Sequence, residues 1–504
     1  MVRPTKETPA PMTGGVLALD LGTSMVKAVL VSPNGEVLHA GQVPVPRGEQ
    51  GVVDTLPLWD LVAEAIQQVL ASVGGAEHVQ AVIATGQGDG LWMLDKEGKP
   101  LPQAFLWNSN AGAHVVAQWA DDGSIDSHFR ATGTVLWSGS QAALWRWFSE
   151  SQSKLASTVS AVMCAKDLVN YLLCGERATD VTDASIPFLR PGTTTYSFEA
   201  AEKLGCGPLI DLLPAVRQPG ELLGTVSPLA AQHTGLRAGT PVHVGALDVV
   251  AMLWGSGQGE IGDVFAVLGT TALTASVTPR SAFDGDPVGA SISLPDDSKS
   301  LRAMGSSSGT ATLEWFLTLH GFTGVERYEN FWKEVDASHG GDEIFLPYLA
   351  GERAPFLAPH ATGSFLGLTS NSTVGSMGRA VVEGITMAMC LGMDFSLPEV
   401  NARESTIVLA GGGSLSPQWA QMVSNVSGKT VIVDGRAHLG ALGVAGLILD
   451  GTGEIATTRE IAISAFSPDN NHPALLLRYE VFQEAIHAVS PLWGHTSASK
   501  EESP

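Results

Sequence analysis

Basic residues are scarce in this chain. Its 504 residues include 28 Lys and Arg against 51 Asp and Glu, which gives a formal net charge of −23 with His neutral. A protein this acidic repels the phosphates of nucleic acid and of an anionic membrane surface, so we expect neither as a partner. An anionic small ligand would have to be attracted by local dipoles and a metal ion, because the overall field repels it.

Cysteine is also rare, and no long apolar run occurs. The thirteen histidines form no His-Glu-x-x-His pattern, which leaves a metalloprotease without support. No stretch approaches the roughly 18 apolar residues of a membrane span, and the opening "MVRPTKETPAPMTGG" lacks the apolar core of a signal peptide. We therefore expect a cytoplasmic protein whose widely spaced cysteines are reduced thiols, not a disulfide framework or a zinc site: Cys164, Cys174, Cys206 and Cys390.

The chain is too long for one hydrophobic core, so we expect two domains of similar size. The predicted boundaries are a disordered tail over 1–13, domains over 14–254 and 255–493, and a second disordered tail over 494–504. The first domain opens with three apolar strands separated by short turns, of which Asn34-Gly35 is a strong hairpin signal. A helix with one apolar face follows over 57–70 and a strand over 79–87, which is how a ribonuclease H-like unit begins.

The strand–turn–strand pattern that opens the first domain recurs about half the chain length later. The stretch "GDVFAVLGTTALTASVTP" (262–279) again runs from an apolar strand through Leu-Gly-Thr-Thr into another apolar strand. Aligned on the glycines, Leu21-Gly22-Thr23-Ser24 matches Leu268-Gly269-Thr270-Thr271, which favours a duplicated domain over a chance match of four residues.

The first of these turns has the composition of a phosphate site. Gly22 leaves the backbone open to an anion, while Thr23 and Ser24 add hydroxyls to the backbone N–H groups. Lys27 would oppose the charge of a phosphoryl group in transfer, and Asp20 would hold Mg²⁺ directly or through water. The alternative is an ordinary hairpin turn capped by a buried aspartate. No Gly-x-x-x-x-Gly-Lys-[Ser/Thr] sequence occurs, so the turn is not a P-loop.

A single acid interrupts the apolar segment "VHVGALDVVAMLWGSG" (242–257). Partial desolvation of Asp248 would raise its pKa, and such a carboxylate can accept the proton of a substrate hydroxyl during phosphoryl transfer. The alternative is that Asp248 only caps the helix that follows.

With these motifs the chain resembles the FGGY family of carbohydrate kinases from about Gly15 to Trp493. The segments that carry the resemblance are "DLGTSMVK", "GALDVVAMLWGSG", "LGTTA", "PYLAGERAPF" (347–356) and "AGGGSLSPQWAQMVSNVSGKTV" (410–431). The resemblance implies an α/β fold of two duplicated ribonuclease H-like, or actin-like ATPase, domains with an interdomain cleft. It also implies ATP and Mg²⁺ as cofactors, with the sugar bound by the N-terminal domain and the nucleotide by the C-terminal one.

The resemblance also assigns roles to individual residues. It implies Asp248 as the catalytic base and Asp20 with Asp248 as metal ligands. The residues that it implies for ATP binding are Gly22, Thr23, Ser24, Lys27, Gly269, Thr270, Gly309, Gly412, Gly413 and Gln418.

The substrate region is similar to the erythritol kinase and L-xylulose kinase branch, because Gly88-Asp89-Gly90 follows Gln87. The Asp89 carboxylate can accept hydrogen bonds from two neighbouring hydroxyls, which suits a short polyol or an open-chain ketose. Its alternative is a turn aspartate before glycine. Trp107 and Trp137 would line the substrate pocket. The alternative is that both tryptophans only pack in the hydrophobic core. The predicted substrate-binding set is therefore Gln87, Asp89, Trp107, Trp137 and Asp248.

One segment departs from the family pattern. Relatives usually carry Trp-x-Asp-x-Arg where this chain reads Trp107-Asn108-Ser109-Asn110-Ala111, so an acid and a cation are replaced by neutral groups.

We therefore predict ATP-dependent phosphorylation of a hydroxyl of a tetritol, pentitol or pentulose. The first alternative is a catalytically altered family member that binds nucleotide or sugar as a regulator. The second is an actin- or Hsp70-like ATPase acting on a protein. The prediction leaves a homodimer open.

Overall fold

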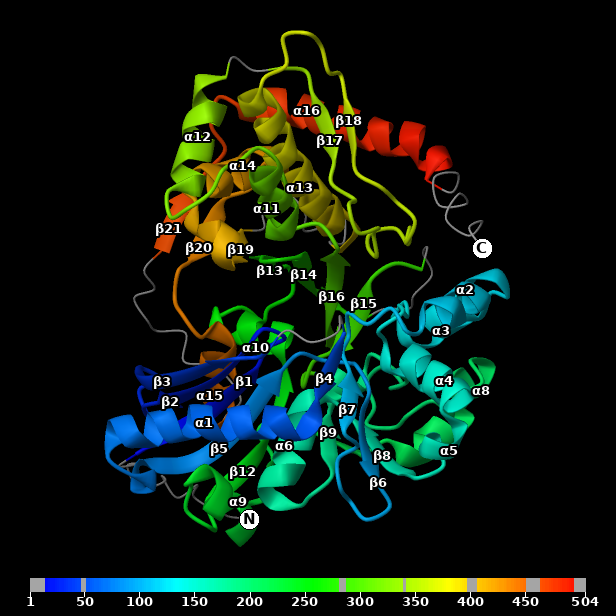
Figure 1. Ribbon diagram of the computed structural model, residues 1–504, viewed down its shortest axis with the longest axis vertical. Helices are drawn as coiled ribbons and strands as arrows, with labels where there is room; N and C mark the ends of the chain where they lie inside the picture. The colour runs from blue at the N-terminus through cyan, green and yellow to red at the C-terminus, as the bar shows by residue number, and fades with distance from the viewer. Residues whose placement is uncertain are drawn as a thin grey trace, which may run out of the picture. The chain divides into compact units, whose positions relative to one another are not determined.

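A computed structural model of the protein describes residues 14–46, 51–280, 287–338, 341–396, 406–449 and 463–493 (Figure 1). These residues form two compact units. Unit 1 holds the described residues of 14–132, 136–257 and 438–449, and unit 2 holds those of 133–135, 258–437 and 463–493. The segment 438–449 thus joins unit 1, although the predicted boundary assigned it to the second domain. The two predicted tails, 1–13 and 494–504, lie outside the described residues.

Unit 1 is built on a six-stranded sheet in the order β11-β12-β5-β1-β2-β3. β1, β2 and β3 pair antiparallel, whereas β5 runs parallel to β1 and β12 runs parallel to β5. The predicted hairpin turn lies between β2 and β3, with Gly35 at φ 66°. The strands are β1 (Gly15–Leu21), β2 (Met25–Val31), β3 (Val37–Pro44), β5 (Val79–Gly86), β11 (Leu222–Thr225) and β12 (Pro241–Leu247).

Helices cover both faces of this sheet, which explains the nearly continuous apolar sequence of its central strand. Leu17 and Leu19 of β1 pack against α1 (Thr55–Val73) and α6 (Ala165–Cys174) on one face. Val16 and Ala18 pack against α10 (Asp248–Gly255) and α15 (Leu439–Leu449) on the other. Successive side chains of a strand point to opposite faces, so every residue of this run is buried except at its polar end.

Unit 1 has further elements besides this sheet and the helices that cover it. They are β4 (Val52–Asp54), η1 (Ala76–His78), β6 (Trp92–Asp95), β7 (Gln103–Phe105), α2 (Ala113–Asp121), α3 (Ser124–Thr132), α4 (Gln141–Ser151), α5 (Ser153–Ala156), β8 (Val159–Met163), β9 (Ala178–Asp180), α7 (Val181–Ala184), α8 (Phe198–Lys203), η2 (Gly207–Leu212), β10 (Ala215–Arg217) and α9 (Pro228–Thr234).

Unit 2 repeats the same sheet plan in the order β15-β16-β14-β13-β19-β20-β21. β13, β14 and β16 pair antiparallel, and β19 and β20 run parallel to β13, as β5 and β12 do relative to β1. The internal repeat predicted from the two Leu-Gly-Thr turns is therefore confirmed at the level of strand order. The strands are β13 (Val264–Leu268), β14 (Ala272–Pro279), β15 (Ala290–Ser293), β16 (Lys299–Ser306), β19 (Ile407–Ala410), β20 (Val431–Asp434) and β21 (Ile463–Phe466).

Four helices pack on the core face of the second sheet: α11 (Thr310–Leu319), α12 (Arg327–Ala337), α13 (Val374–Ser396) and α14 (Pro417–Ser427). α13 is long and apolar enough to cross a membrane by composition, but 78% of its most apolar window is buried inside the protein, as in a core helix. The other elements are β17 (Ile344–Leu346), β18 (Ser364–Leu366), η3 (Gly412–Leu415), α16 (His472–Val489) and η4 (Ser490–Leu492).

Candidate active site

The predicted site residues of unit 1 gather where three parallel strands end. Leu21, Gly86 and Leu247 are the last residues of β1, β5 and β12, and they lie in one row across the sheet. Gly22, Gln87 and Asp248 follow them directly, so the sheet register alone brings these three residues together. Ligands of open α/β sheets bind beyond this carboxyl edge.

The β1–β2 turn spans only Gly22, Thr23 and Ser24, closed by the Gly22 N–H donating to the Met25 carbonyl at 3.1 Å. Antiparallel pairing sets Asp20 opposite Lys27, and the Lys27 Nζ lies 3.0 Å from Asp20 Oδ2. Both side chains are partly exposed, so the ammonium keeps access to solvent and to an anion.

A chain of side-chain hydrogen bonds joins this turn to the predicted substrate residues. Thr23 Oγ1 donates to Gln87 Oε1 at 2.9 Å and accepts from Trp107 Nε1 at 3.2 Å. Trp137 Nε1 in turn donates to the Trp107 carbonyl at 2.8 Å. Both tryptophans are half-buried. Each indole N–H is therefore used for positioning, while part of each ring remains open.

Asp248 is the first residue of α10, and its Oδ1 accepts the N–H of Val249 at 2.6 Å. Burial is the main cause that raises its pKa to about 7, and the neighbouring Asp20 carboxylate raises it further against the opposing effects of the Val249 N–H and Lys27. Such a carboxyl can take up and release a proton near neutral pH. Two nearby carboxylates are also an oxygen donor set that suits Mg²⁺.

Asp89 occupies a left-handed turn position, with φ 61°, and its side chain is buried. Its Oδ1 accepts the N–H of Gln141, at the start of α4, at 2.6 Å, whereas Oδ2 has no hydrogen-bond partner among the described residues. Burial raises the Asp89 pKa well above its usual value. Gly88 is required beside it, since a Cβ there would lie 2.6 Å from Asp183 Oδ1.

The predicted nucleotide residues of unit 2 gather in the same way beyond β13 and β19. The β13–β14 turn again has three residues, Gly269, Thr270 and Thr271, with the Gly269 N–H donating to the Thr271 carbonyl at 3.1 Å. Gly309 precedes α11 and lies against this turn, where a Cβ would come within 2.6 Å of the Thr270 carbonyl oxygen.

The glycine turn after β19 completes this edge. A Cβ on Gly413 would lie 2.6 Å from the Leu268 side chain, so this glycine is needed for packing, whereas a Cβ on Gly412 would meet nothing within 4 Å. Gly412 and Gln418 are exposed, and Gln418 Oε1 accepts a hydrogen bond from the Ser416 hydroxyl at 3.3 Å.

Comparison with known proteins assigns the family. Residues 15–255 match the N-terminal domain, and residues 264–449 the C-terminal domain, of the FGGY family of carbohydrate kinases. The chain belongs to this family.

Individual relatives extend over nearly the whole chain. The kinase is 27% identical to the L-xylulose/3-keto-L-gulonate kinase of Escherichia coli K12, over 97% of this chain and 99% of that protein. It is 26% identical to the erythritol kinase of Brucella abortus, over 96% of this chain and 98% of that protein. The crystal structure of a ligand-bound xylulose kinase from Lactobacillus acidophilus matches the fold with a TM-score of 0.87 at 21% identity, covering 96% of this chain and all of that one.

The kinase carries neutral groups in the segment that departs from the family pattern. Ser109 is buried, and its hydroxyl accepts the Ala111 N–H at 3.3 Å. Asn108 Oδ1 is buried without a hydrogen-bond partner among the described residues, and Asn110 Oδ1 accepts from the Ser138 hydroxyl at 3.3 Å. The segment offers hydrogen bonds to a ligand but no charge.

Sequence reasoning missed a buried ionic cluster directly behind Asp248. The cluster residues lie in two otherwise uncharged segments, "VMCAKDLVNYLL" and "ATDVTDASIPF": Lys166, Asp167, Asp180 and Asp183. Charged residues inside buried apolar stretches were the available signal, because such residues are almost never fully buried unless paired.

Proposed function

We propose that this kinase transfers the γ-phosphoryl group of ATP to a hydroxyl of a short polyol or ketose: a tetritol, a pentitol or a pentulose. The observation that carries the proposal is the row Leu21–Gly86–Leu247, which sets the Gly22 turn, Gln87 and Asp248 side by side. The names of the L-xylulose and erythritol kinases among its relatives support this substrate class.

In the proposed reaction, the Asp248 carboxylate accepts the proton of the substrate hydroxyl as its oxygen attacks the γ-phosphorus. The new O–P bond forms while the bond between the γ-phosphorus and the β–γ bridging oxygen breaks, and ADP leaves. Lys27 and the N–H groups of the Gly22 turn oppose the negative charge of the transferring group. Asp20 and Asp248 would hold Mg²⁺, which would neutralise phosphate charge.

In this proposal, the residues of unit 1 bind the polyol, and the glycine-rich edge of the unit 2 sheet binds the nucleotide. Asp89 Oδ2, buried without a partner among the described residues, would form a hydrogen bond with a substrate hydroxyl. The uncharged Asn108–Asn110 segment would favour a neutral polyol or ketose over a sugar acid. A cytoplasmic location is proposed because the four cysteines form no disulfide.

The test is ADP release across a panel of three- to six-carbon polyols and ketoses, with the phosphorylated hydroxyl located by ³¹P NMR. We expect turnover with at least one tetritol, pentitol or pentulose and a loss of about 10²-fold or more in Asp248→Asn. Turnover of that variant within tenfold of the parent would remove Asp248 as base. Nucleotide binding without turnover on any member would instead support the regulator.

A further inference from the structure

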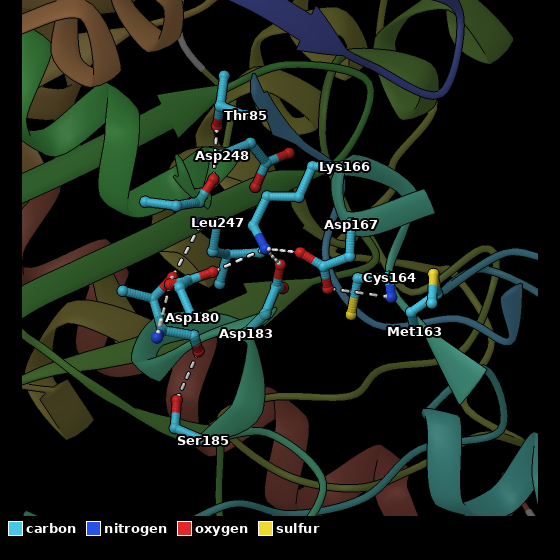
Figure 2. Close-up of polar contacts among 12 residues, drawn as sticks. Thr85, Met163, Cys164, Lys166, Asp167, Asp180, Asp183, Ser185, Leu247 and Asp248 are labelled. Atoms are coloured by element: carbon cyan, nitrogen blue, oxygen red, sulfur yellow. Dashed lines mark hydrogen bonds and ion pairs between the residues drawn. The ribbon is translucent and has the colours of Figure 1, made fainter. Parts of the chain in front are cut away.

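The buried cluster behind the active site is centred on one lysine. Lys166 is fully buried at the start of α6, and its Nζ lies 2.6 Å from Asp167 Oδ1, 2.7 Å from Asp180 Oδ2 and 2.7 Å from Asp183 Oδ2. Figure 2 shows the three carboxyl groups turned toward this nitrogen. The acids come from α6, β9 and α7, so the lysine ties three short elements together.

The cluster is not a metal site in this arrangement. Cys164, Asp167 and Asp183 offer ligand atoms within 4.8 Å of one another, but the Lys166 ammonium already supplies the cation that two of these groups contact. Burial raises the pKa of the Cys164 thiol well above its usual value, which disfavours the thiolate that a metal requires.

Buried charges are costly, so an arrangement of this kind calls for an explanation beyond stability. Burial is the main cause that raises the pKa of Asp183 to about 8. The Lys166 ammonium lies within ion-pair distance of all three acids and opposes this rise. Of the three acids, Asp180 is the one that links the cluster to the active site.

Asp180 orients the hydroxyl group of Thr182 through hydrogen bonds. Asp180 Oδ1 accepts the Thr182 N–H at 2.8 Å and also the Thr182 hydroxyl proton. Since the hydroxyl has a single proton, which points to Asp180, its lone pairs face the opposite direction. There Thr182 Oγ1 accepts the N–H of Leu247 at 2.8 Å. Leu247 is the last residue of β12 and directly precedes Asp248.

The cluster also supports the Gln87–Asp89 turn. Asp183 Oδ1 and Leu247 Cδ1 both lie against Gly88, within 2.6 Å of the position of a Cβ on that residue. The same buried group therefore lies behind the proposed base and behind the proposed polyol contact.

We propose that Thr182, oriented by Asp180 and Lys166, is a positioning residue that fixes the β12–α10 junction and thereby the direction of the Asp248 carboxylate. This inference rests on the proposed role of Asp248, and it assigns a function to a fully buried hydroxyl that bonds Asp180 and Leu247. A misplacement of the base by about 1 Å can lower turnover about 10²-fold.

The test compares Thr182→Val, which keeps the shape and loses the hydroxyl, with Thr182→Ser, which keeps the hydroxyl. We expect T182V to lower kcat by about tenfold or more while KM for ATP stays within about threefold, and T182S to restore kcat to within about threefold of the parent. This split, together with rescue by serine, is not expected of a residue that only stabilises the fold.

Thr234→Val is the matched control. Thr234 is fully buried in unit 1, its hydroxyl donates to the Ala230 carbonyl at 2.7 Å, and it accepts the Leu236 N–H at 3.2 Å, as Thr182 does for Leu247. We expect T234V to lower the melting temperature while leaving kcat unchanged. Equal loss of kcat in T234V and T182V, unchanged kcat in T182V, or no rescue by serine would each overturn the positioning role.

Two further variants keep the outcome decisive. If T182V does not fold, Thr182→Ala replaces it as the variant that lacks the hydroxyl. We then expect the Thr182→Ser variant to retain turnover and the Thr182→Ala variant to lose it. Asp248→Asn is assayed in the same series. Turnover of D248N within tenfold of the parent rejects the proposed base and this inference with it, whereas loss in D248N with unchanged T182V rejects the positioning role alone.

Discussion

Replacing Asp248 by asparagine should stabilise this kinase while inactivating it. The Asp248 pKa of about 7 lies above the usual 3.8 because folding buries the carboxyl beside Asp20. The folded state therefore binds the proton more tightly than the unfolded state does. This contribution to stability is complete below about pH 4 and is lost as the pH rises through about 7. Asparagine does not titrate, so D248N lacks this pH-dependent loss of stability.

The expected size follows from the two pKa values. At about 1.4 kcal/mol per pH unit, the wild type loses about 3 kcal/mol relative to D248N between pH 5 and pH 8. Because Asp248 is partly exposed, water reduces this to about 2 kcal/mol. For a unit of this size, that corresponds to about 4–8 °C in melting temperature.

The assay is differential scanning calorimetry of wild type and D248N at pH 5 and pH 8, with a chelator present to remove divalent cations. The advantage of D248N in melting temperature should be about 4–8 °C larger at pH 8 than at pH 5. Asp121→Asn, an exposed aspartate at the end of α2, serves as the control and should show no such difference. An equal advantage of D248N at both pH values would refute the argument that Asp248 is costly to ionise.

The remaining predictions concern turnover and ligand affinity. Wild-type kcat/KM for the polyol, which reports the free enzyme, should rise about tenfold per pH unit below about pH 7 and level off above it, because Asp248 must be ionised to accept a proton; a flat profile from pH 5 to pH 8 would exclude it as the base. Gly412→Ala should leave the melting temperature unchanged, since its Cβ meets nothing within 4 Å, yet raise KM for ATP about tenfold if a nucleotide approaches that backbone; unchanged KM contradicts the assignment. Gly309→Ala should both destabilise unit 2 and weaken ATP binding, because its Cβ would press on the Thr270 carbonyl, and calorimetry with ATP titration measures the two effects. Asp89→Asn should raise KM for the polyol about tenfold or more and leave KM for ATP within about twofold; an effect on ATP alone would place Asp89 elsewhere in the mechanism.

The local sequence was sufficient to predict the two Gly-Thr turns. Each follows an apolar strand and precedes another, and a three-residue hairpin turn depends only on its immediate neighbours. The strand-to-helix junction at Asp248 was predictable for the same reason, since one acid in an apolar run marks both a helix start and partial burial.

Other relationships depend on pairing between distant segments. Thr23 and Trp107 are 84 residues apart in the chain, and Thr182 and Leu247 are 65 apart, yet each pair shares a hydrogen bond. Helix α15 follows a strand of the second sheet and packs on the first. No periodicity in the sequence encodes such contacts.

The sequence by itself therefore determined the family, the duplicated sheet plan and the residue types at the carboxyl edges of the strands, because these follow from short apolar patterns and the turns between them. Only the tertiary structure decided which polar groups support the proposed base. The Lys166 cluster and its bond through Thr182 to Leu247 exist because β9, α6 and α7 pack beside the end of β12. Their charges are stable there only when all the partners are present in the folded state.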